Sequence, residues 1–240
     1  MRTLIFADTH LTEEFDPILC DYIAKLVKSV DQVIINGDFW DCYLTSFDKF
    51  INSSWSTLFP LLKHKSIYLY GNHDPAKSMD KRVNLFSKLQ VDHFQLIAGK
   101  RTFVIEHGHR VAGEFNDVHP LISKLVTKHF SRFYPTVDSW HFRRDFLGKI
   151  WRGYTSTRAK NLQHQLRRYA YSHRKKNVVR VFAHSHLPAH EEIDQGFICL
   201  GASRFGKFRH LIIDEQSLKF VVSNYHSYTS KGDLARNLAH

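Results

Sequence analysis

The sequence contains few cysteines and no long apolar run. Its three cysteines, Cys20, Cys42 and Cys199, are odd in number and widely spaced, which argues against a disulfide framework and a cysteine-based zinc site. Such cysteine usage favours a reducing, cytoplasmic compartment. The apolar run in residues 1–7 ends at Asp8, before it reaches the length of a signal sequence. No other run approaches the roughly 20 apolar residues that span a bilayer, so we do not expect an integral membrane protein.

The composition is that of an ordinary folded protein with an uneven distribution of charge. The chain has 240 residues, 43% of them hydrophobic and 24% charged, which suffices for one large domain or two small ones with a hydrophobic core. The net charge is +11, and residues 115–176 hold fourteen Lys or Arg against three acidic residues. This local excess predicts an anionic partner, which is a phosphorylated substrate, nucleic acid or an anionic membrane surface.

The first 90 residues alternate between apolar strands and amphipathic helices. Strands are predicted at residues 2–7, 32–36 and 66–70, and helices at residues 15–29, 47–63 and 80–89. This alternation indicates a largely parallel sheet flanked by helices.

The second half of the sequence predicts a helical insertion followed by a second sheet. Residues 115–176 contain eleven aromatic residues at helix-compatible spacing and no convincing strand. A pair of strands is predicted before the insertion, at residues 92–97 and 101–106. After the insertion, strands are predicted at residues 177–182, 190–193, 197–200, 208–213 and 218–222, which we expect to form a second, mostly antiparallel sheet. We therefore predict a core of residues 1–114 and 177–222, an insertion of residues 115–176 and a polar tail of residues 223–240.

Five clusters of metal-ligating side chains each follow a predicted strand. They are Asp8-Thr9-His10, Gly37-Asp38-Phe39-Trp40-Asp41, Gly71-Asn72-His73-Asp74, His107-Gly108-His109 and Ala183-His184-Ser185-His186. A single histidine after a strand is usually a packing or capping residue. Five such clusters at the carboxyl ends of strands, where α/β sheets place their active sites, indicate a common site.

In this order the clusters resemble the calcineurin-like metallophosphoesterase superfamily, whose pattern runs D-x-H, G-D-x-x-D, G-N-H-[DE], H and G-H-x-H. The resemblance covers nearly the whole chain outside the insertion, and it departs at Ala183, where the family usually has glycine. It implies an α/β fold, a two-sheet αββα sandwich with a helical cap. It also implies a hydrolase that cleaves a phosphoester or pyrophosphate bond by attack of a metal-bound hydroxide.

The resemblance implies two divalent metal ions and a role for each cluster. Asp38 would bridge both ions; Asp8, His10 and His186 would complete one ligand set, and Asn72, His107 and His184 the other. His109 is a second candidate beside His107. Oxygen and imidazole donors without thiolate suit manganese, which we expect, or iron or zinc.

The resemblance also implies a catalytic pair next to the metal ligands. His73 would face the substrate as a phosphate-stabilising group or as a general acid for the leaving oxygen. Asp41 would orient and charge His73. Asp74 would fix its loop by accepting hydrogen bonds from the main chain.

The insertion leaves the predicted core after His107 and returns before His184, so it must lie close to the site. Its basic and aromatic residues predict substrate contacts through Arg143, Arg144 and Trp151; alternatively, its aromatic residues pack on the core with solvated basic faces. Its position resembles the cap of UDP-2,3-diacylglucosamine pyrophosphohydrolases, although their well-known branch carries arginine where this chain has His73. That resemblance implies a lipid-linked pyrophosphate substrate and peripheral contact of residues 115–176 with the inner face of a membrane.

Two other functions remain open on sequence alone. One is a nuclease or nucleotide phosphodiesterase, because nucleases of the same superfamily share these clusters and a basic, aromatic surface can stack bases. The other is a scaffold without catalytic activity, although every expected ligand position is filled here. We predict no obligate protein partner.

Overall fold

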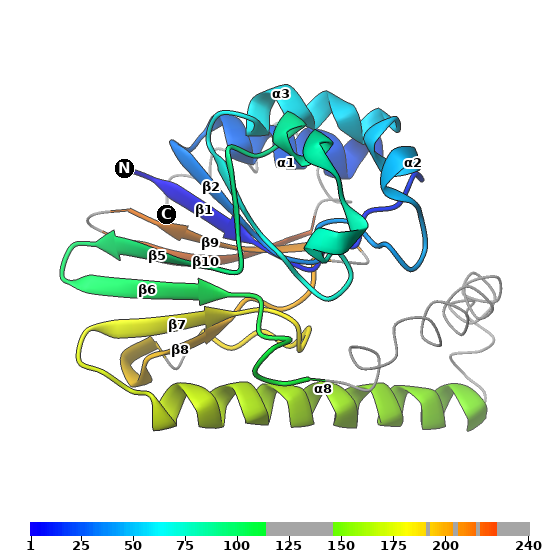
Figure 1. Cartoon of the computed structure of the whole chain (residues 1–240). Helices are drawn as coiled ribbons and strands as arrows, with labels where there is room; N and C mark the ends of the chain where they lie inside the picture. The colour runs from blue at the N-terminus through cyan, green and yellow to red at the C-terminus, as the bar shows by residue number, and fades with distance from the viewer. Residues whose placement is uncertain (114–145, 191–192, 204–205, 215–216, 225–240) are drawn as a thin grey trace.

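Two β-sheets pack face to face, and helices cover both outer faces (Figure 1). This arrangement is seen in a computed structural model that describes residues 1–113, 146–190, 193–203, 206–214 and 217–224. Residues 114–145, which hold most of the N-terminal part of the predicted insertion, and residues 225–240 of the predicted tail lie outside the described residues.

The first sheet has six strands in the order β10-β9-β1-β2-β3-β4. The strands are β1 (Thr3–Phe6), β2 (Gln32–Asn36), β3 (Ser66–Leu69), β4 (Leu89–Val91), β9 (Lys207–Ile213) and β10 (Leu218–Asn224). Strands β1, β2 and β3 are parallel to one another, as predicted, and β4 continues the parallel order, whereas β9 runs antiparallel to both β1 and β10. All four residues of β1 and of β3 are buried, as expected for strands covered on both faces.

The second sheet has four strands in the order β5-β6-β7-β8. They are β5 (His93–Ala98), β6 (Arg101–Glu106), β7 (Val178–Phe182) and β8 (Phe197–Cys199). Only the β5–β6 pair is antiparallel; β6, β7 and β8 are parallel. The prediction of a mostly antiparallel second sheet was wrong, because β9 and β10 belong to the first sheet. Phe208 and the four residues from His210 to Ile213 of β9 are buried, so both faces of the strand are covered, which suits a place between β1 and β10.

Two other predicted elements were also wrong in part. Residues 191–192 of the strand predicted at 190–193 lie outside the described residues; beside them, Ala189 makes a single bridge to Cys199, and Ile193–Gln195 forms a 3-10 turn. Residues 80–89 contain a 3-10 helix at Lys81–Leu85 and then the start of β4. Strand β4 has three residues, too few for an alternating pattern to be recognised.

The helices on the first sheet begin and end at capping residues. Helix α1 (Pro17–Lys28) begins later than predicted, because the Asp16 carboxylate accepts hydrogen bonds from the main-chain N–H groups of Ile18 and Leu19. The predicted helix at 47–63 is divided into α2 (Phe47–Ile51), a 3-10 helix (Ser54–Leu58) and α3 (Phe59–Leu62), with Ser53 capping the second of these.

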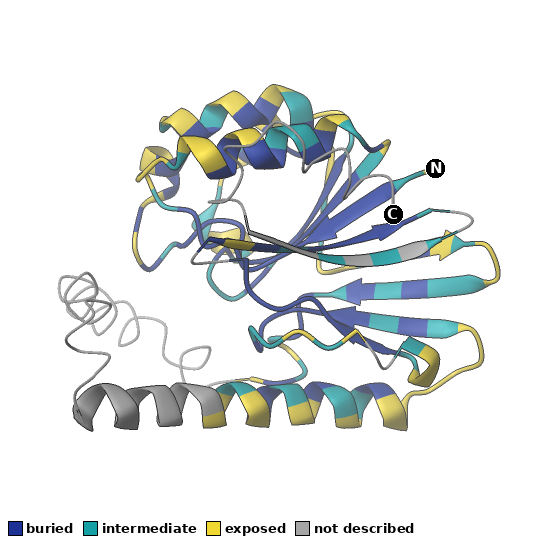
Figure 2. Ribbon diagram, turned by 180° about the vertical axis from the view of Figure 1, so that it is seen from behind, coloured by how far each residue is buried: buried dark blue, intermediate teal, exposed yellow. Residues whose placement is uncertain are grey.

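Apolar layers on and between the sheets hold the sandwich together. Phe6, Val33 and Tyr68 of the first sheet pack against α1 and its neighbouring helices. The inner faces of the two sheets meet through side chains such as Ile34 and Phe103, and Figure 2 shows these strands as mostly buried. Burial of these apolar faces stabilises the layers and confirms the predicted αββα sandwich.

Helix α8 (Phe146–Ser172) forms the outer layer over the second sheet. Its residues Leu162, Leu166 and Ala170 are buried against Phe182 and Phe197, so this part of the predicted insertion packs on the core. The N-terminal half of α8 extends past the carboxyl ends of β6 and β7 (Figure 1). Among the described residues, no helix combines the length and apolar character needed to span a bilayer. The boundaries of the insertion remain a prediction.

A buried histidine in β9 makes stability sensitive to acid. His210 is 1% exposed, packs on Tyr22 and Phe208, and its Nδ1 has no hydrogen-bond partner within the described residues. Burial, assisted by the charge of Arg2, lowers the pKa of His210 to about 3. In the unfolded chain the pKa of histidine is about 6.5, so between these values the unfolded state binds more protons. Stability therefore falls as the pH falls below about 6.5.

His210→Leu is expected to weaken this dependence. The free energy of unfolding is measured by urea denaturation from pH 7 to pH 4. Its slope against pH should be smaller in the variant by up to about 1.4 kcal/mol per pH unit, the contribution of one proton. His64→Leu, which removes an exposed histidine, is the control and should leave the slope unchanged. Parallel curves for His210→Leu and the unmodified protein would contradict the prediction.

Candidate active site

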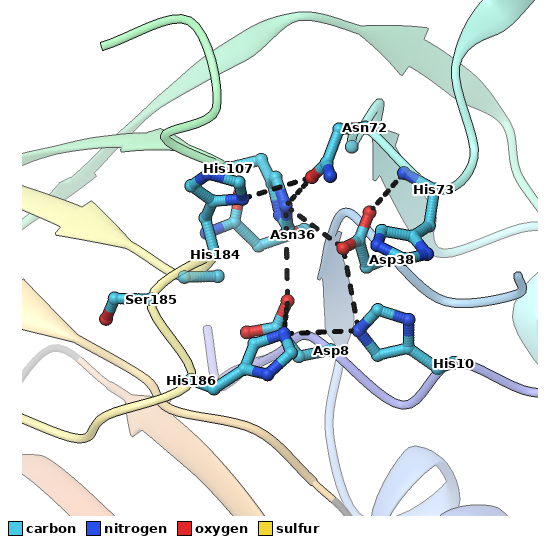
Figure 3. A network of polar contacts seen from close by, with 12 residues as sticks. Asp8, His10, Asn36, Asp38, Asn72, His73, His107, His184, Ser185 and His186 are labelled. Atoms are coloured by element: carbon cyan, nitrogen blue, oxygen red, sulfur yellow. Dashed lines mark hydrogen bonds and ion pairs between the residues drawn. The ribbon is translucent and has the colours of Figure 1, made fainter. Parts of the chain in front are cut away.

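The carboxyl ends of five strands meet at one edge of the sandwich and bring the five clusters together (Figure 3). The clusters follow β1, β2 and β3 of the first sheet and β6 and β7 of the second. The residues delivered to this edge are Asp8, His10, Asp38, Asp41, Asn72, His73, His107, His184 and His186. Every metal-ligating or catalytic residue predicted from the sequence core therefore lies at the same edge.

Backbone strain is concentrated in these loops. Asp8, His10, Asp38, His184 and His186 have φ angles of 52°, 45°, 51°, 63° and 61°, in the left-handed region that non-glycine residues rarely adopt. Only one other non-glycine residue among the described ones shares this feature. Each such conformation costs about 1–3 kcal/mol and persists where the surroundings impose it, commonly at functional sites.

Two glycines allow the loops to approach one another. A Cβ atom at Gly37, whose φ is +79°, would lie 2.5 Å from Nδ1 of His107. A Cβ atom at Gly71 would clash with Oδ1 of Asp38. Side chains at either position would therefore displace site residues.

The first group of donors contains Asp8, His10, Asp38 and His186. Their candidate ligand atoms all lie within 4.8 Å of one another. Nε2 of His10 is 3.3 Å from Nε2 of His186 and 3.5 Å from Oδ2 of Asp38, while Nε2 of His186 is 3.9 Å from Oδ1 of Asp8. This is the set that the resemblance assigned to the first metal ion together with the bridging carboxylate.

The second group is centred on Asn72. Its Oδ1 lies 3.2 Å from Nε2 of His107 and 3.1 Å from Nδ1 of His184. Oδ2 of Asp38 lies 3.4 Å from Nε2 of His107. One oxygen of Asp38 is thus within 3.5 Å of a histidine from each group, as a bridging carboxylate would be.

Partners outside the two donor groups set the orientation of three histidine rings. Nδ1 of His107 donates to the main-chain oxygen of Asn36 at 2.8 Å, and Nε2 of His184 donates to that of Ala112 at 2.9 Å. Nδ1 of His10 lies 3.1 Å from Oδ2 of Asp41. Because a carbonyl oxygen only accepts, the first two contacts place a proton on Nδ1 of His107 and on Nε2 of His184. The other ring nitrogen, Nε2 of His107 and Nδ1 of His184, is left to bind a cation.

The partners of His107 and His184 were not predictable from the sequence. Both are main-chain carbonyl groups, which any residue type supplies, so no sequence signal pointed to Asn36 or Ala112.

Asp41 connects the first donor group to His73. Its Oδ2 accepts from Nδ1 of His73 at 2.9 Å as well as from His10, and its Oδ1 accepts from the main-chain N–H of Tyr43. Burial alone would raise the pKa of Asp41, but the charge of His73 and the two histidine hydrogen bonds outweigh it and hold that pKa well below its usual range. The side chain of His73 is 20% exposed, so a substrate can reach it.

The buried carboxylates at this edge require positive charges to compensate them. Asp8 and Asp38 are 0% and 1% exposed, and within the described part of the chain the ion pairs of Asp38 are all with histidines. Burial raises the pKa of Asp38, but the charges of His107 and His73 outweigh it and keep the pKa well below normal. Burial likewise opposes protonation of His107, yet the charge of Asp38 raises the pKa of that histidine to about 10.

The donor set fits divalent metal ions of the kind that bind imidazole and carboxylate. Cys199, whose Sγ lies 3.2 Å from the Ser185 hydroxyl in the last cluster, does not offer a thiolate, because burial raises its pKa to about 12. A bound cation would compensate the negative charge of these buried carboxylates, and the imidazoles beside them would complete its ligands. The donors thus match the divalent ions that the sequence pattern implied.

Asp74 fixes the loops, as predicted. Its carboxylate accepts from the main-chain N–H groups of Asp38, Phe39 and Gly71 at 2.7–3.0 Å, and from the Tyr68 hydroxyl. Burial, followed by the charge of Asp38, raises the pKa of Asp74 to about 6.

The other residues predicted for the site are His109 and three residues of the insertion. His107, not its neighbour His109, approaches Asn72 and Asp38, while the His109 ring centroid lies 5.5 Å from that of His107. Arg143 and Arg144 lie outside the described residues. Trp151 belongs to α8, but its side chain is outside the described part.

The sequence pattern of these loops is that of a known family. A family model of calcineurin-like phosphoesterases matches residues 1–197, a span that includes all five clusters. The chain belongs to the calcineurin-like phosphoesterase family. It is accordingly a metal-dependent phosphoester hydrolase with the two-sheet fold of that family.

Several solved structures are similar to this phosphoesterase. A single mutant of Vps29 from Entamoeba histolytica is 13% identical with a TM-score of 0.45, over 92% of this chain and 91% of that chain. The phosphoesterase Yfce from E. coli is 12% identical with a TM-score of 0.43, over 94% and 100%. A predicted phosphoesterase from Streptococcus pneumoniae TIGR4 is 16% identical with a TM-score of 0.40, over 96% and 93%. No curated protein matches the chain.

Proposed function

We propose that this phosphoesterase holds two divalent cations that share Asp38. The observation that carries the proposal is the position of the Asp38 Oδ2 atom, 3.5 Å from Nε2 of His10 and 3.4 Å from Nε2 of His107. Asp8, His10 and His186 would hold one cation, and Asn72, His107 and His184 the other. When bound, such ions supply Lewis acidity toward the phosphoryl oxygens and activate water at neutral pH; manganese is our first choice.

In this proposal His73 donates a proton to the leaving oxygen. Its Nδ1–H is directed to Oδ2 of Asp41 at 2.9 Å, so Nε2 is the nitrogen that faces the substrate. The anionic Asp41 favours the protonated imidazole and fixes its orientation. The main-chain N–H of His73 donates to Oδ1 of Asp38 at 2.9 Å, which ties this residue to the shared carboxylate.

For the substrate we propose a lipid-linked pyrophosphate of the UDP-2,3-diacylglucosamine type. The excess positive charge of residues 115–176 supports an anionic substrate. The N-terminal half of α8 extends beyond the strand ends that carry the site (Figure 1), so its neighbourhood is within reach of a large substrate. Arg143 and Arg144 would contact phosphate and Trp151 the acyl chains, and the segment would contact the inner face of a membrane from the cytoplasm.

The test is a substrate panel after removal and replacement of metal. Metal-stripped protein receives manganese, iron or zinc and is assayed on UDP-2,3-diacylglucosamine, bis-(p-nitrophenyl) phosphate and single-stranded DNA. The proposal expects fastest, manganese-dependent release of UMP, stimulated by detergent or liposomes. Activity restricted to the generic ester would reject the lipid pyrophosphate, and faster cleavage of DNA with steep salt dependence would instead establish a nuclease.

The insertion is tested separately with Arg143→Gln combined with Arg144→Gln. Hydrogen bonds to charged groups contribute about 1.5–3 kcal/mol each, so KM for the acylated substrate should rise at least about tenfold while turnover of bis-(p-nitrophenyl) phosphate is retained. The matched control is Lys28→Gln with Lys63→Gln, which removes two exposed charges elsewhere. Equal KM values for the two double variants would contradict the role of the arginines.

A further inference from the structure

The aromatic ring of Tyr43 lies against the His73 imidazole. Tyr43 is 7% exposed, and its ring centroid is 4.6 Å from that of His73 at an interplanar angle of 74°. The His10 ring makes a second contact of this kind with His73, at 4.5 Å and 85°. Such edge-to-face contacts are favourable and depend on geometry. The rings of Tyr43 and His10 therefore restrict the orientation of the His73 imidazole.

The main chain around Tyr43 holds the same groups. The Tyr43 N–H donates to Oδ1 of Asp41 at 3.0 Å, which leaves Oδ2 to the histidines. The N–H of Cys42 donates to the His73 carbonyl oxygen at 2.8 Å. By comparison, the bond from the Tyr43 hydroxyl to the main-chain oxygen of Asn72 is long, at 3.4 Å. The ring of Tyr43, more than its hydroxyl, is what contacts the catalytic candidate.

These contacts leave His73 little freedom. Its backbone is held at the N–H by Asp38 and at the carbonyl by Cys42, so the imidazole can move only by rotation of its side chain. Asp41 accepts from the Nδ1 end of the ring, and the edge-to-face contact with Tyr43 opposes rotation of the ring. Misplacement of a reacting group by about 1 Å can cost about 10²-fold in rate.

We propose that Tyr43 is a positioning residue, which holds His73 so that Nε2 can donate to the leaving oxygen. The inference rests on the proposed role of His73. It predicts that loss of the Tyr43 ring harms only reactions that need this donation, because basic leaving groups require protonation and weakly basic ones do not.

The experiment compares leaving groups in the full chain loaded with manganese. The substrates are bis-(p-nitrophenyl) phosphate, which releases a weakly basic phenolate, and diphenyl phosphate, which releases a more basic one. Tyr43→Leu is expected to lower kcat for diphenyl phosphate about 10–100-fold and kcat for the nitrophenyl ester less than about threefold. Tyr43→Phe keeps the ring and should behave as the unmodified protein. Equal losses on both substrates, or no loss on diphenyl phosphate, would overturn the inference.

A double-mutant cycle separates this inference from the proposed function. In the His73→Ala background, Tyr43→Leu should reduce turnover of diphenyl phosphate less than about twofold further, because residues that act as a unit are not additive. Additive losses would show that Tyr43 does not act through His73. If His73→Ala itself lowers both substrates equally, His73 is not the acid, and the proposed function fails together with the inference.

Controls address folding and metal binding. Phe47→Leu makes the same kind of change at a residue that is also 7% exposed and packs on Trp40, and it should affect both substrates equally or not at all. Should Tyr43→Leu fail to fold, Tyr43→Met fills the space with a flexible chain and carries the same expectation. In metal-free protein, the ¹⁵N signals of the neutral form of His73, before Nε2 gains its proton, should show one tautomer, with the proton on Nδ1 beside Asp41, in Tyr43→Phe and averaged tautomers in Tyr43→Leu. One tautomer in both would overturn the inference.

Discussion

Asp38→Asn is expected to lower kcat/KM by at least about 10³-fold and to abolish the retention of divalent ions. The shared oxygen, Oδ2, is within 3.5 Å of both His10 and His107, and a neutral amide there supplies no negative charge to either cation. Loss of several kcal/mol of charge stabilisation, at about 1.4 kcal/mol per factor of ten, accounts for the expected magnitude. The substitution keeps the size of the side chain and an oxygen that can accept from the His73 N–H.

The effect on metal is measured independently of turnover. Metal content is determined after dialysis, and thermal unfolding is recorded with and without added manganese, since a cation that binds only the folded state raises Tm. The unmodified protein should show the increase, and Asp38→Asn should not. Asp21→Asn, which removes an exposed carboxylate on α1, is the control for loss of a charge. Normal metal content in Asp38→Asn would show that Asp38 does not join the ions.

The sequence predicted which residues meet, because it encodes both their type and their place after strands. In an α/β fold the carboxyl ends of parallel strands share an edge, so recognition of β1, β2, β3, β6 and β7 placed Asp8, Asp38, Asn72, His107 and His184 together without any distance information. The family pattern supplied the division into two donor groups. Spacing alone could not have done so, because Asp38 lies next to both groups.

Features that depend on main-chain geometry were not predictable in this way. Asn36 and Ala112 orient His107 and His184 through carbonyl oxygens, which have no side-chain signature. Tyr43 contacts His73 from another loop, and no period or motif joins these two residues. Their roles follow from how neighbouring loops cross, which is decided by backbone conformations such as the positive φ of Asp38 and Gly37.

The main error in the predicted fold was the assignment of strands to the two sheets. This assignment also depends on geometry that local sequence patterns do not contain. Alternating or apolar patterns show that residues 208–213 form a strand, but both sheets of the sandwich offer apolar surroundings. The pairing of Phe6 with His210 in the first sheet is a long-range choice that local patterns do not contain. The same limit applies to α8, whose buried residues Leu162 and Leu166 resemble those of any amphipathic helix.

His73→Ala is expected to separate turnover from metal binding. His73 contacts the site through Asp41 and the main chain of Asp38, and its imidazole belongs to neither proposed ligand set, so manganese content and the manganese-induced rise in Tm should be retained. Turnover of substrates with basic leaving groups should fall about 10²–10⁴-fold, the usual contribution of a general acid. Loss of bound metal in this variant would show that His73 is instead a ligand.

The size of the His73→Ala effect also reports on the natural substrate. Cleavage of an acylated pyrophosphate releases a phosphate monoester whose second pKa is about 6, so this leaving group needs little protonation. We therefore expect the loss on UDP-2,3-diacylglucosamine to be much smaller than the loss on diphenyl phosphate, whose phenolate resembles that of tyrosine with a pKa near 10. A comparable loss on both would mean that His73 stabilises the transferred phosphoryl group instead of protonating the leaving oxygen. The contact between Asp41 and His73 would then serve to keep a positive charge beside that group.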